Sequence, residues 1–142
     1  MSTSKNNQNL ESLWERLSTL TKETPLSTLN EITAFFAPTG SFYPNGMTQP
    51  PCTSHESLIT TFQNLATYWK MAERKVVSHV EGEDGTIVNA MDNKLLILGE
   101  EVNGFGECEV VKFDAEGRIK EYLLYCDSTA VKEVFAKKAA AA

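Results

Sequence analysis

Residues that build metal centres and disulfide frameworks are scarce in this sequence. It contains three cysteines, Cys52, Cys108 and Cys126, and two histidines, His55 and His79. The cysteines are odd in number, widely spaced and not arranged as CxxC pairs, and the histidines lie elsewhere, so neither a zinc site nor a disulfide framework is expected. We therefore predict buried free thiols, a reducing compartment and no metal ligands.

The sequence also lacks long apolar runs and an excess of basic residues. No run approaches the roughly 20 apolar residues that span a bilayer, and residues 1–9 have no apolar stretch typical of a signal peptide. The formal net charge is −6, with lysine and arginine scattered. Nucleic-acid binding normally needs a basic stripe. We expect a cytoplasmic protein with neither a nucleic-acid nor a membrane partner.

The chain of 142 residues is long enough for a single core. We predict a disordered N-terminus over residues 1–8, one domain over residues 9–138 and a frayed tail over residues 139–142. No internal repeat or low-complexity segment divides this domain.

Apolar residues at three- and four-residue steps predict the helices. Leu10, Leu13, Trp14 and Leu17 form such a stripe, which indicates a helix over residues 9–22. Similar stripes indicate helices over residues 28–36 and from about residue 54 through Trp69. The second of these follows Thr53-Ser54-His55-Glu56, a predicted capping box. A last helix over residues 129–138 follows Asp127-Ser128, which can cap it.

Beyond residue 74 the period changes to two, which is typical of strands. We predict strands over residues 75–81, 86–98, 105–113 and 119–126, and a short one over residues 41–43, separated by glycine-containing turns. Helices followed by a mostly antiparallel meander and a final helix indicate an α+β fold with helices on one face of a curved sheet.

Several local motifs resemble one known family. Residues 113–119 read Phe-Asp-x-x-Gly-Arg-Ile and are followed by Tyr-x-Asp at residues 125–127. Together with Ala37-Pro38 and Pro50-Pro51, their order resembles the SnoaL-like branch of the nuclear-transport-factor-2-like superfamily, over roughly residues 9–136. This resemblance implies a cone-shaped sheet wrapped around N-terminal helices, a homodimer formed through that sheet and no cofactor. It also implies the chemistry of fungal secondary-metabolite isomerases, cyclases and dehydratases.

The resembling group commonly carries an acid on its last strand, inside an otherwise apolar cone. In this sequence that position is Leu124, while Phe36 stands where several relatives have arginine. Cys108 falls where an aromatic hydroxyl is often found. Leu124 and Cys108 are therefore predicted substrate-binding positions, and the acid mechanism of the family cannot simply be carried over to this sequence.

The last strand offers two alternating sets of side chains. One contains Tyr122, Leu124 and Cys126, and the other contains Glu121 and Tyr125. Periodicity does not choose between them, whereas the resemblance favours the first set as pocket-facing. Tyr122 is then the polar group of the pocket; with the opposite orientation, Glu121 is a buried catalytic carboxylate, and otherwise it is a surface charge paired with lysine or arginine.

Two histidines complete the catalytic candidates. His55, at a helix N-terminus, can stay neutral and act as a base, or can be an exposed first-turn residue. His79 shares a strand face with Val77 and Glu81, which favours partial exposure. The remaining candidate substrate-binding residues are Tyr43, Trp69, Phe105 and Asn89.

These features favour a cofactor-free isomerase or cyclase acting on a hydrophobic natural-product intermediate. The reaction is a proton-transfer rearrangement or a shape-driven pericyclic cyclisation. The alternative is a non-catalytic small-molecule-binding or dimerisation module, because this fold also serves those purposes. An ionisable group that faces the cavity with a raised pKa would favour catalysis.

Overall fold

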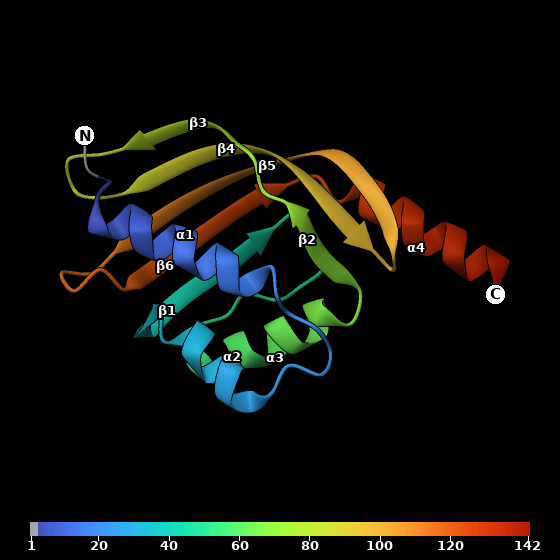
Figure 1. Cartoon of the computed structure of the whole chain (residues 1–142), viewed down its shortest axis with the longest axis horizontal. Helices are drawn as coiled ribbons and strands as arrows, with labels where there is room; N and C mark the ends of the chain where they lie inside the picture. Colours follow the sequence, from blue (N-terminus) through green and yellow to red (C-terminus); the bar gives the residue numbers. More distant parts are fainter. Residues whose placement is uncertain (1–2) are drawn as a thin grey trace.

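The computed structural model describes residues 3–142, which form four helices and six strands (Figure 1). In chain order these are α1 (Lys5–Leu17), α2 (Leu26–Thr33), β1 (Phe36–Asn45), α3 (His55–Ala66), β2 (Trp69–Glu73), β3 (Val76–Glu81), β4 (Ile87–Ile97), β5 (Glu100–Phe113), β6 (Ile119–Cys126) and α4 (Thr129–Ala141).

The first helix is shifted toward the N-terminus relative to the prediction. The Ser4 hydroxyl caps α1 by accepting a hydrogen bond from the Asn7 amide, so the helix begins at Lys5 and ends at Leu17. Residues 5–8 of the predicted disordered segment are therefore helical, and residues 1–2 lie outside the described residues. The predicted apolar stripe of α1 is buried, as expected.

The third helix also begins differently from the prediction. Ser54, rather than Thr53, is the N-cap of α3, and it forms the capping box with Ser57 rather than Glu56. The helix ends at Ala66, so Trp69 starts strand β2 instead of continuing the helical stripe. Leu65, in the helix, and Trp69, in the strand, are both buried. Their four-residue spacing therefore looks helical in the sequence although the helix ends between them.

The six strands form one sheet in the order β1-β6-β5-β4-β2, with β3 also paired to β4. β1 and β6 are parallel, and the other pairs are antiparallel. The register shifts between Asn93 and Leu95 where β4 meets β5, and between Met71 and Glu73 on β2. Such irregularities bend strands and increase their twist. The sheet therefore curls, with α1, α2 and α3 on its concave side (Figure 1).

Two turns of the sheet hold α1 in place. The Asn9 side chain donates a hydrogen bond to the Gly117 carbonyl (2.8 Å), and Asn6 donates to the Gly85 carbonyl (3.2 Å). Gly117 has φ +82°, a backbone conformation that favours glycine, and a Cβ there would also lie 2.8 Å from Asn9 Nδ2 and push that side chain aside. These contacts fix α1 across the concave face and set the position of Trp14.

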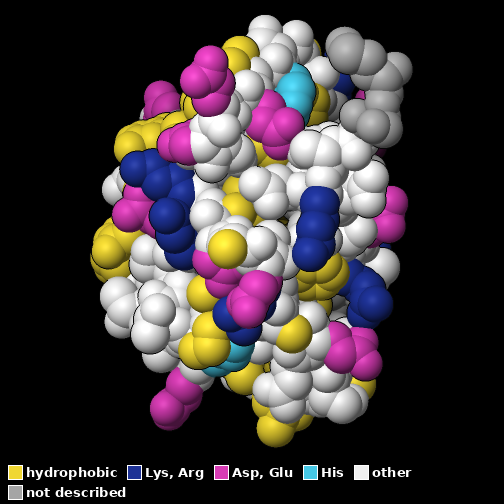
Figure 2. All heavy atoms as spheres, turned by 90° about the vertical axis from the view of Figure 1, so that its left-hand side faces the viewer, with side chains coloured by type: hydrophobic (Ala, Val, Ile, Leu, Met, Phe, Trp, Pro, Cys, Tyr) yellow, Lys and Arg dark blue, Asp and Glu magenta, His cyan; other side chains and the backbone are white. Residues whose placement is uncertain are grey.

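The observed architecture confirms the predicted α+β class, the curved mostly antiparallel sheet and the C-terminal helix. The three cysteines are free, although only Cys52 is fully buried. Within residues 3–142, none of the helices is long and apolar enough to cross a membrane. Figure 2 shows acidic and basic side chains interspersed on one end of the molecule. The homodimer stays a prediction.

Candidate active site

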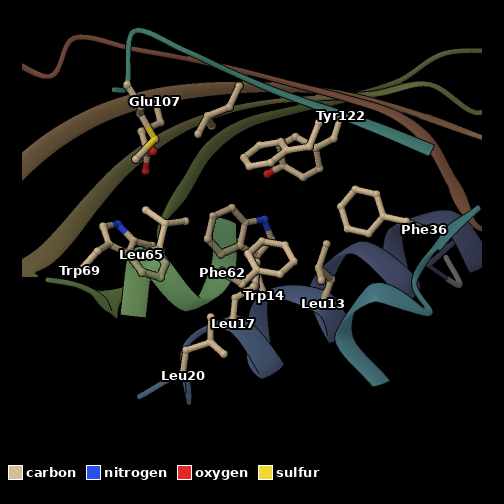
Figure 3. Close-up of a pocket in the computed structure, with 13 residues that line it drawn as sticks. Leu13, Trp14, Leu17, Leu20, Phe36, Phe62, Leu65, Trp69, Glu107 and Tyr122 are labelled. Atoms are coloured by element: carbon tan, nitrogen blue, oxygen red, sulfur yellow. The ribbon is translucent and has the colours of Figure 1, made fainter. Parts of the chain in front are cut away.

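A small cavity lies between the concave face of the sheet and helices α1 and α3 (Figure 3). Its volume is about 40 Å³, room for roughly three water molecules. Its walls are almost entirely apolar and aromatic, and the Glu107 carboxylate points into it. The lining residues are Leu13, Trp14, Leu17, Leu20, Phe36, Phe42, Met47, Phe62, Leu65, Trp69, Glu107, Tyr122 and Leu124.

Strand β5 sends two carboxylates toward the interior. Glu107 and Glu109 occupy every second position of the strand, in line with buried Phe105, Val111 and Phe113. All five side chains therefore share the concave face. Glu109 is 0% exposed and Glu107 is 8% exposed. Buried carboxylates are costly unless they are paired or hydrogen-bonded, so the partners of each one decide its chemistry.

Glu109 receives four hydrogen bonds from side chains. Its Oε1 accepts from the Trp14 indole nitrogen (2.9 Å) and from the Tyr122 hydroxyl. Its Oε2 accepts from the Asn89 amide nitrogen (2.8 Å) and from Arg74 (2.9 Å). Because both oxygens already accept from donors and one faces a guanidinium, the arrangement suits an ionised carboxylate.

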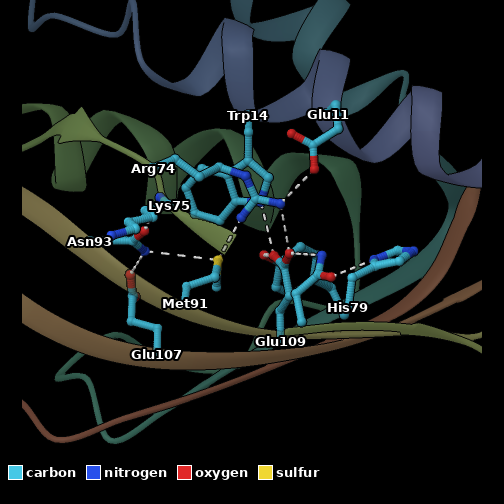
Figure 4. A network of polar contacts seen from close by, with 11 residues as sticks. Glu11, Trp14, Arg74, Lys75, His79, Met91, Asn93, Glu107 and Glu109 are labelled. Carbon is cyan, nitrogen blue, oxygen red and sulfur yellow. Dashed lines mark hydrogen bonds and ion pairs between the residues drawn. The ribbon is translucent and has the colours of Figure 1, made fainter. Parts of the chain in front are cut away.

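Arg74 supplies the positive charge at this site (Figure 4). It lies between β2 and β3, with its guanidinium 4.9 Å from the Trp14 ring centre, and it also pairs with Glu11 at 2.9 Å. Burial works against its charge, but Glu109 and the hydrogen bond to Glu11 outweigh burial and raise the pKa of Arg74. Arg74 thus stays charged and offsets the charge of Glu109.

Glu107 has a different environment from Glu109. Its one side-chain hydrogen bond within residues 3–142 comes from the Asn93 amide nitrogen, at 2.6 Å. Asn93 is fixed in turn by the Lys75 backbone amide, which donates to its side-chain oxygen (3.0 Å). Burial raises the pKa of Glu107 to about 7, helped by Glu109 and opposed by Asn93 and Arg74. Glu107 therefore exchanges a proton near neutral pH.

Tyr122 connects the network to the cavity. It lies on β6, lines the cavity and packs edge-on against Phe42, with ring centres 5.3 Å apart. Burial, and then the nearby Glu109 charge, raise the pKa of Tyr122 above its usual value. Its hydroxyl therefore stays protonated and remains a hydrogen-bond donor.

An open polar cleft lies on the other side of this network. Its volume is about 550 Å³, and Glu11, Trp14, Arg74, His79 and Asn89 are among its walls. His79 Nδ1 lies 2.6 Å from the Asn89 side-chain oxygen. Since the Asn89 nitrogen donates to Glu109, its oxygen accepts, and His79 Nδ1 is the donor. His79 thus orients Asn89 from the cleft and does not reach the cavity.

Three of the sequence-predicted residues line the cavity, namely Tyr122, Trp69 and Leu124. The pocket-facing set of β6 is thus the one that the resemblance favoured. Asn89 is also inward but bonds Glu109, and Phe105 lines a second small cavity beneath α4.

The other predicted residues lie away from this cavity. Glu121 is on the outer face of the sheet, where its carboxylate lies 3.8 Å from the Lys112 ammonium. Cys108 and Tyr43 are half-buried on that same outer face. Side chains alternate along a strand, and the residues on either side of these two point inward. His55 Nε2 lies 3.1 Å from the Phe36 and Ala37 carbonyls, so its ring ties α3 to β1.

Sequence reasoning missed the three charged residues that dominate the site, Glu107, Glu109 and Arg74. A signal was present for the two glutamates, because they occupy every second position between Phe105 and Val111 on a predicted strand. Arg74 had no such signal, since it lies at an irregular junction between strands. Within the described residues, no three His, Cys, Asp or Glu side chains are grouped as metal ligands.

Comparisons with known proteins identify the fold. No protein-family model matches the sequence, and no curated protein matches it. Three solved structures are similar. A provisionally assigned isomerase from Bacillus subtilis has a TM-score of 0.74 at 14% identity, covering 93% of each chain. A provisionally assigned SnoaL-like polyketide cyclase from Shewanella putrefaciens has a TM-score of 0.72 at 10% identity, covering 96% of this chain and 99% of that one.

The third similar structure is a nuclear-transport-factor-2-like protein of unknown function from Burkholderia pseudomallei. Its TM-score is 0.71 at 18% identity, covering 92% of this chain and 97% of that one. At such low identities the likeness shows the fold, and function has to be argued from the site.

Proposed function

We propose that this chain, which has the nuclear-transport-factor-2-like fold, catalyses a cofactor-free proton-transfer rearrangement of a hydrophobic small molecule. The rearrangement is an isomerisation or a cyclisation. One observation carries the proposal: Glu107 faces an apolar cavity and has a pKa of about 7. A carboxyl group with a pKa near the working pH can both take and return a proton.

The two carboxylates of β5 have different roles, one in positioning and one in proton transfer. Glu109 is saturated with donors and holds Trp14 and Tyr122 in place. Glu107 has a single donor and is free to exchange its proton with the ligand. In many active sites, two neighbouring carboxyl groups take different roles because their environments differ.

The proposed reaction balances without a co-reactant. Glu107 removes a proton from a carbon next to a substrate carbonyl, the electron pair moves onto the carbonyl oxygen, and Glu107 returns the proton to another carbon. Tyr122, which stays protonated, turns from Glu109 and donates a hydrogen bond to that oxygen. The apolar walls exclude water from the carbanion-like intermediate.

The structural neighbours give support at the level of the fold. They include provisionally assigned isomerases and cyclases, which use the same cone. A binding or dimerisation module needs no cavity-facing carboxyl group with a raised pKa, so Glu107 favours catalysis over that alternative. Glu107 also favours proton transfer over a purely shape-driven cyclisation.

The test uses a small apolar enone, for which the cavity must widen beyond its volume of about 40 Å³ in this structure. Conversion of cyclohex-3-enone to cyclohex-2-enone is followed by ultraviolet absorbance of the conjugated product. Exchange of the γ hydrogens of cyclohex-2-enone in D2O, followed by NMR, reports the same proton transfers. We expect Glu107→Gln to reduce both rates by about 10²- to 10⁴-fold.

The matched control is Glu121→Gln, which makes the same change on the outer face, where Glu121 pairs with Lys112. It should leave both rates unchanged. Full activity of Glu107→Gln, or the absence of both reactions in the wild type, would contradict the proposal.

A further inference from the structure

A second cavity of about 50 Å³ lies beneath helix α4 and borders the first. Three residues, Met47, Trp69 and Glu107, line both cavities. They therefore form the partition between an inner cavity, which is the one described above, and this outer cavity. Neither cavity alone has room for more than a few water-sized groups.

Met47 is the part of the partition that can move. It follows the end of β1, on a loop turned by Gly46 with φ +88°, and it is only partly buried. Its unbranched side chain has three rotatable bonds and adapts to irregular spaces. Trp69 and Glu107, by contrast, belong to strands β2 and β5. Met47 is therefore the shared wall residue best able to move and to connect the two cavities.

The outer cavity differs from the inner one in charge. Among residues 3–142, Lys132 is the one cation that lines either cavity, and Ser128 adds a buried polar residue to the outer one. Lys132 lies in the first turn of α4, where the helix dipole also favours negative charge. Glu107 lines both cavities, but only the outer one also has a cation, Lys132, that can bind an anion.

Lys132 is available to a ligand. Lys137 and Lys138, on the same helix, both pair with Glu100, whereas Lys132 has no carboxylate within 4.0 Å among residues 3–142. Asp127 is its acidic neighbour, but that carboxylate accepts from the Thr129 amide (2.9 Å) and hydroxyl (2.6 Å). Those two hydrogen bonds, ahead of Lys132, lower the pKa of Asp127.

We propose that the two cavities form one site for an amphipathic substrate, with an apolar body in the inner cavity and a carboxylate end group bound by Lys132 in the outer one. The inference rests on the proposed function, because it places the reacting carbon at Glu107. It adds the class of substrate, a hydrophobic molecule that carries a carboxylate at the end remote from the reacting carbon.

The test compares two ligands with the same short chain, hexanoate and 1-hexanol, whose size suits the two joined cavities. Trp14 and Trp69 are the only tryptophans of the chain and both line the inner cavity, so their fluorescence reports its occupation. We expect hexanoate to bind the wild type about tenfold more tightly than 1-hexanol, as for one charge-assisted contact. Lys132→Gln should remove this preference without changing the affinity for 1-hexanol. Lys120→Gln, an exposed lysine of β6, should preserve it.

A second pair of variants tests the partition. Met47→Ala should tighten the binding of both ligands, and Met47→Phe should weaken both, while the hexanoate preference persists. The proposal is overturned if neither ligand binds saturably to the wild type. It is also overturned if Lys132→Gln, with an unchanged circular dichroism spectrum, keeps the preference.

These outcomes are separable from those of the proposed function, because binding is measured without turnover. Full activity of Glu107→Gln together with loss of the preference in Lys132→Gln would reject only the reaction. The opposite combination would reject only the carboxylate subsite.

Discussion

Glu107 and Glu109 project from the same face of strand β5, yet Glu109 accepts four side-chain hydrogen bonds and Glu107 accepts one. The difference follows from their neighbours. Arg74, Trp14, Asn89 and Tyr122 converge on Glu109, whereas Glu107 faces the apolar cavity. Strand β5 thus carries a carboxylate held by four donors, Glu109, next to a carboxyl group with a pKa of about 7, Glu107.

The stability of the protein should depend on pH through Glu107. Its pKa rises from 4.5 to about 7 on folding, so between these values the folded state binds more protons than the unfolded state. The free energy of unfolding should therefore fall as pH rises from about 4.5 to 7, by up to about 3 kcal/mol. Urea unfolding at pH 5 and at pH 8 measures this change.

Glu107→Gln should flatten that pH dependence and make the protein more stable at pH 8, because glutamine cannot ionise. Glu121→Gln, on the outer face, should retain the wild-type slope. An equal slope in wild type and Glu107→Gln would show that Glu107 does not titrate in this range.

Arg74 should be essential for stability because Glu109 is fully buried. Arg74→Met keeps much of the apolar contact with Trp14 but leaves the carboxylate without its cation. We expect a loss of about 3–5 kcal/mol in urea unfolding, the usual cost of breaking a buried ion pair. Arg16→Met is the control: Arg16 pairs with Glu31 on the surface at 2.8 Å, and its loss should cost less than about 1 kcal/mol.

The double variant Arg74→Met with Glu109→Gln separates charge from packing. If the cost of Arg74→Met comes from the unpaired carboxylate, neutralising Glu109 should restore a large part of the lost stability. Additive losses in the double variant would instead indicate that Arg74 stabilises the fold mainly by packing.

Tyr122→Phe should affect catalysis more than stability. Glu109 keeps three of its four donors, so we expect a loss of about 1–3 kcal/mol in unfolding. If Tyr122 donates to the substrate oxygen, the rate with cyclohex-3-enone should fall by about 10²-fold or more. Tyr125→Phe, an exposed tyrosine of the same strand, should change neither. A Tyr122→Phe variant with full activity would remove Tyr122 from the mechanism.

Much of the fold was accessible from the sequence because its determinants are local. Strand β6 was predicted with its observed bounds, residues 119–126, since a glycine turn precedes it and Asp127 follows it. Strand β2 was missed because Leu65 and Trp69 keep a helical spacing although the helix ends between them. The actual start of α3 depends on which of two adjacent hydroxyl residues, Thr53 or Ser54, takes the cap conformation.

The site was less accessible because it depends on contacts between distant segments. A glutamate on a half-buried strand is normally expected to face solvent. Burial of Glu109 depends on hydrogen bonds from Arg74 and Trp14, which lie far from it in the sequence. Tyr122 was found because the resemblance chose a face of β6. In the proposed mechanism, Glu107 on the neighbouring strand β5 takes the place of the acid that the family pattern puts at Leu124, and that pattern gave no guidance to it.

The pH dependence of the reaction tests the acid–base assignment most directly. Glu107 must be ionised to accept a proton, so kcat/KM for cyclohex-3-enone should rise with pH and level off above a midpoint of about 7. The Asn93 hydrogen bond lowers the pKa of Glu107, so Asn93→Ala should move this midpoint to higher pH. A purely structural role of Asn93 would lower the rate at every pH without moving the midpoint. Asn103→Ala, an exposed asparagine of β5, should leave both the rate and the midpoint unchanged. A midpoint that is the same in Asn93→Ala and in wild type would assign the titrating group to a residue other than Glu107.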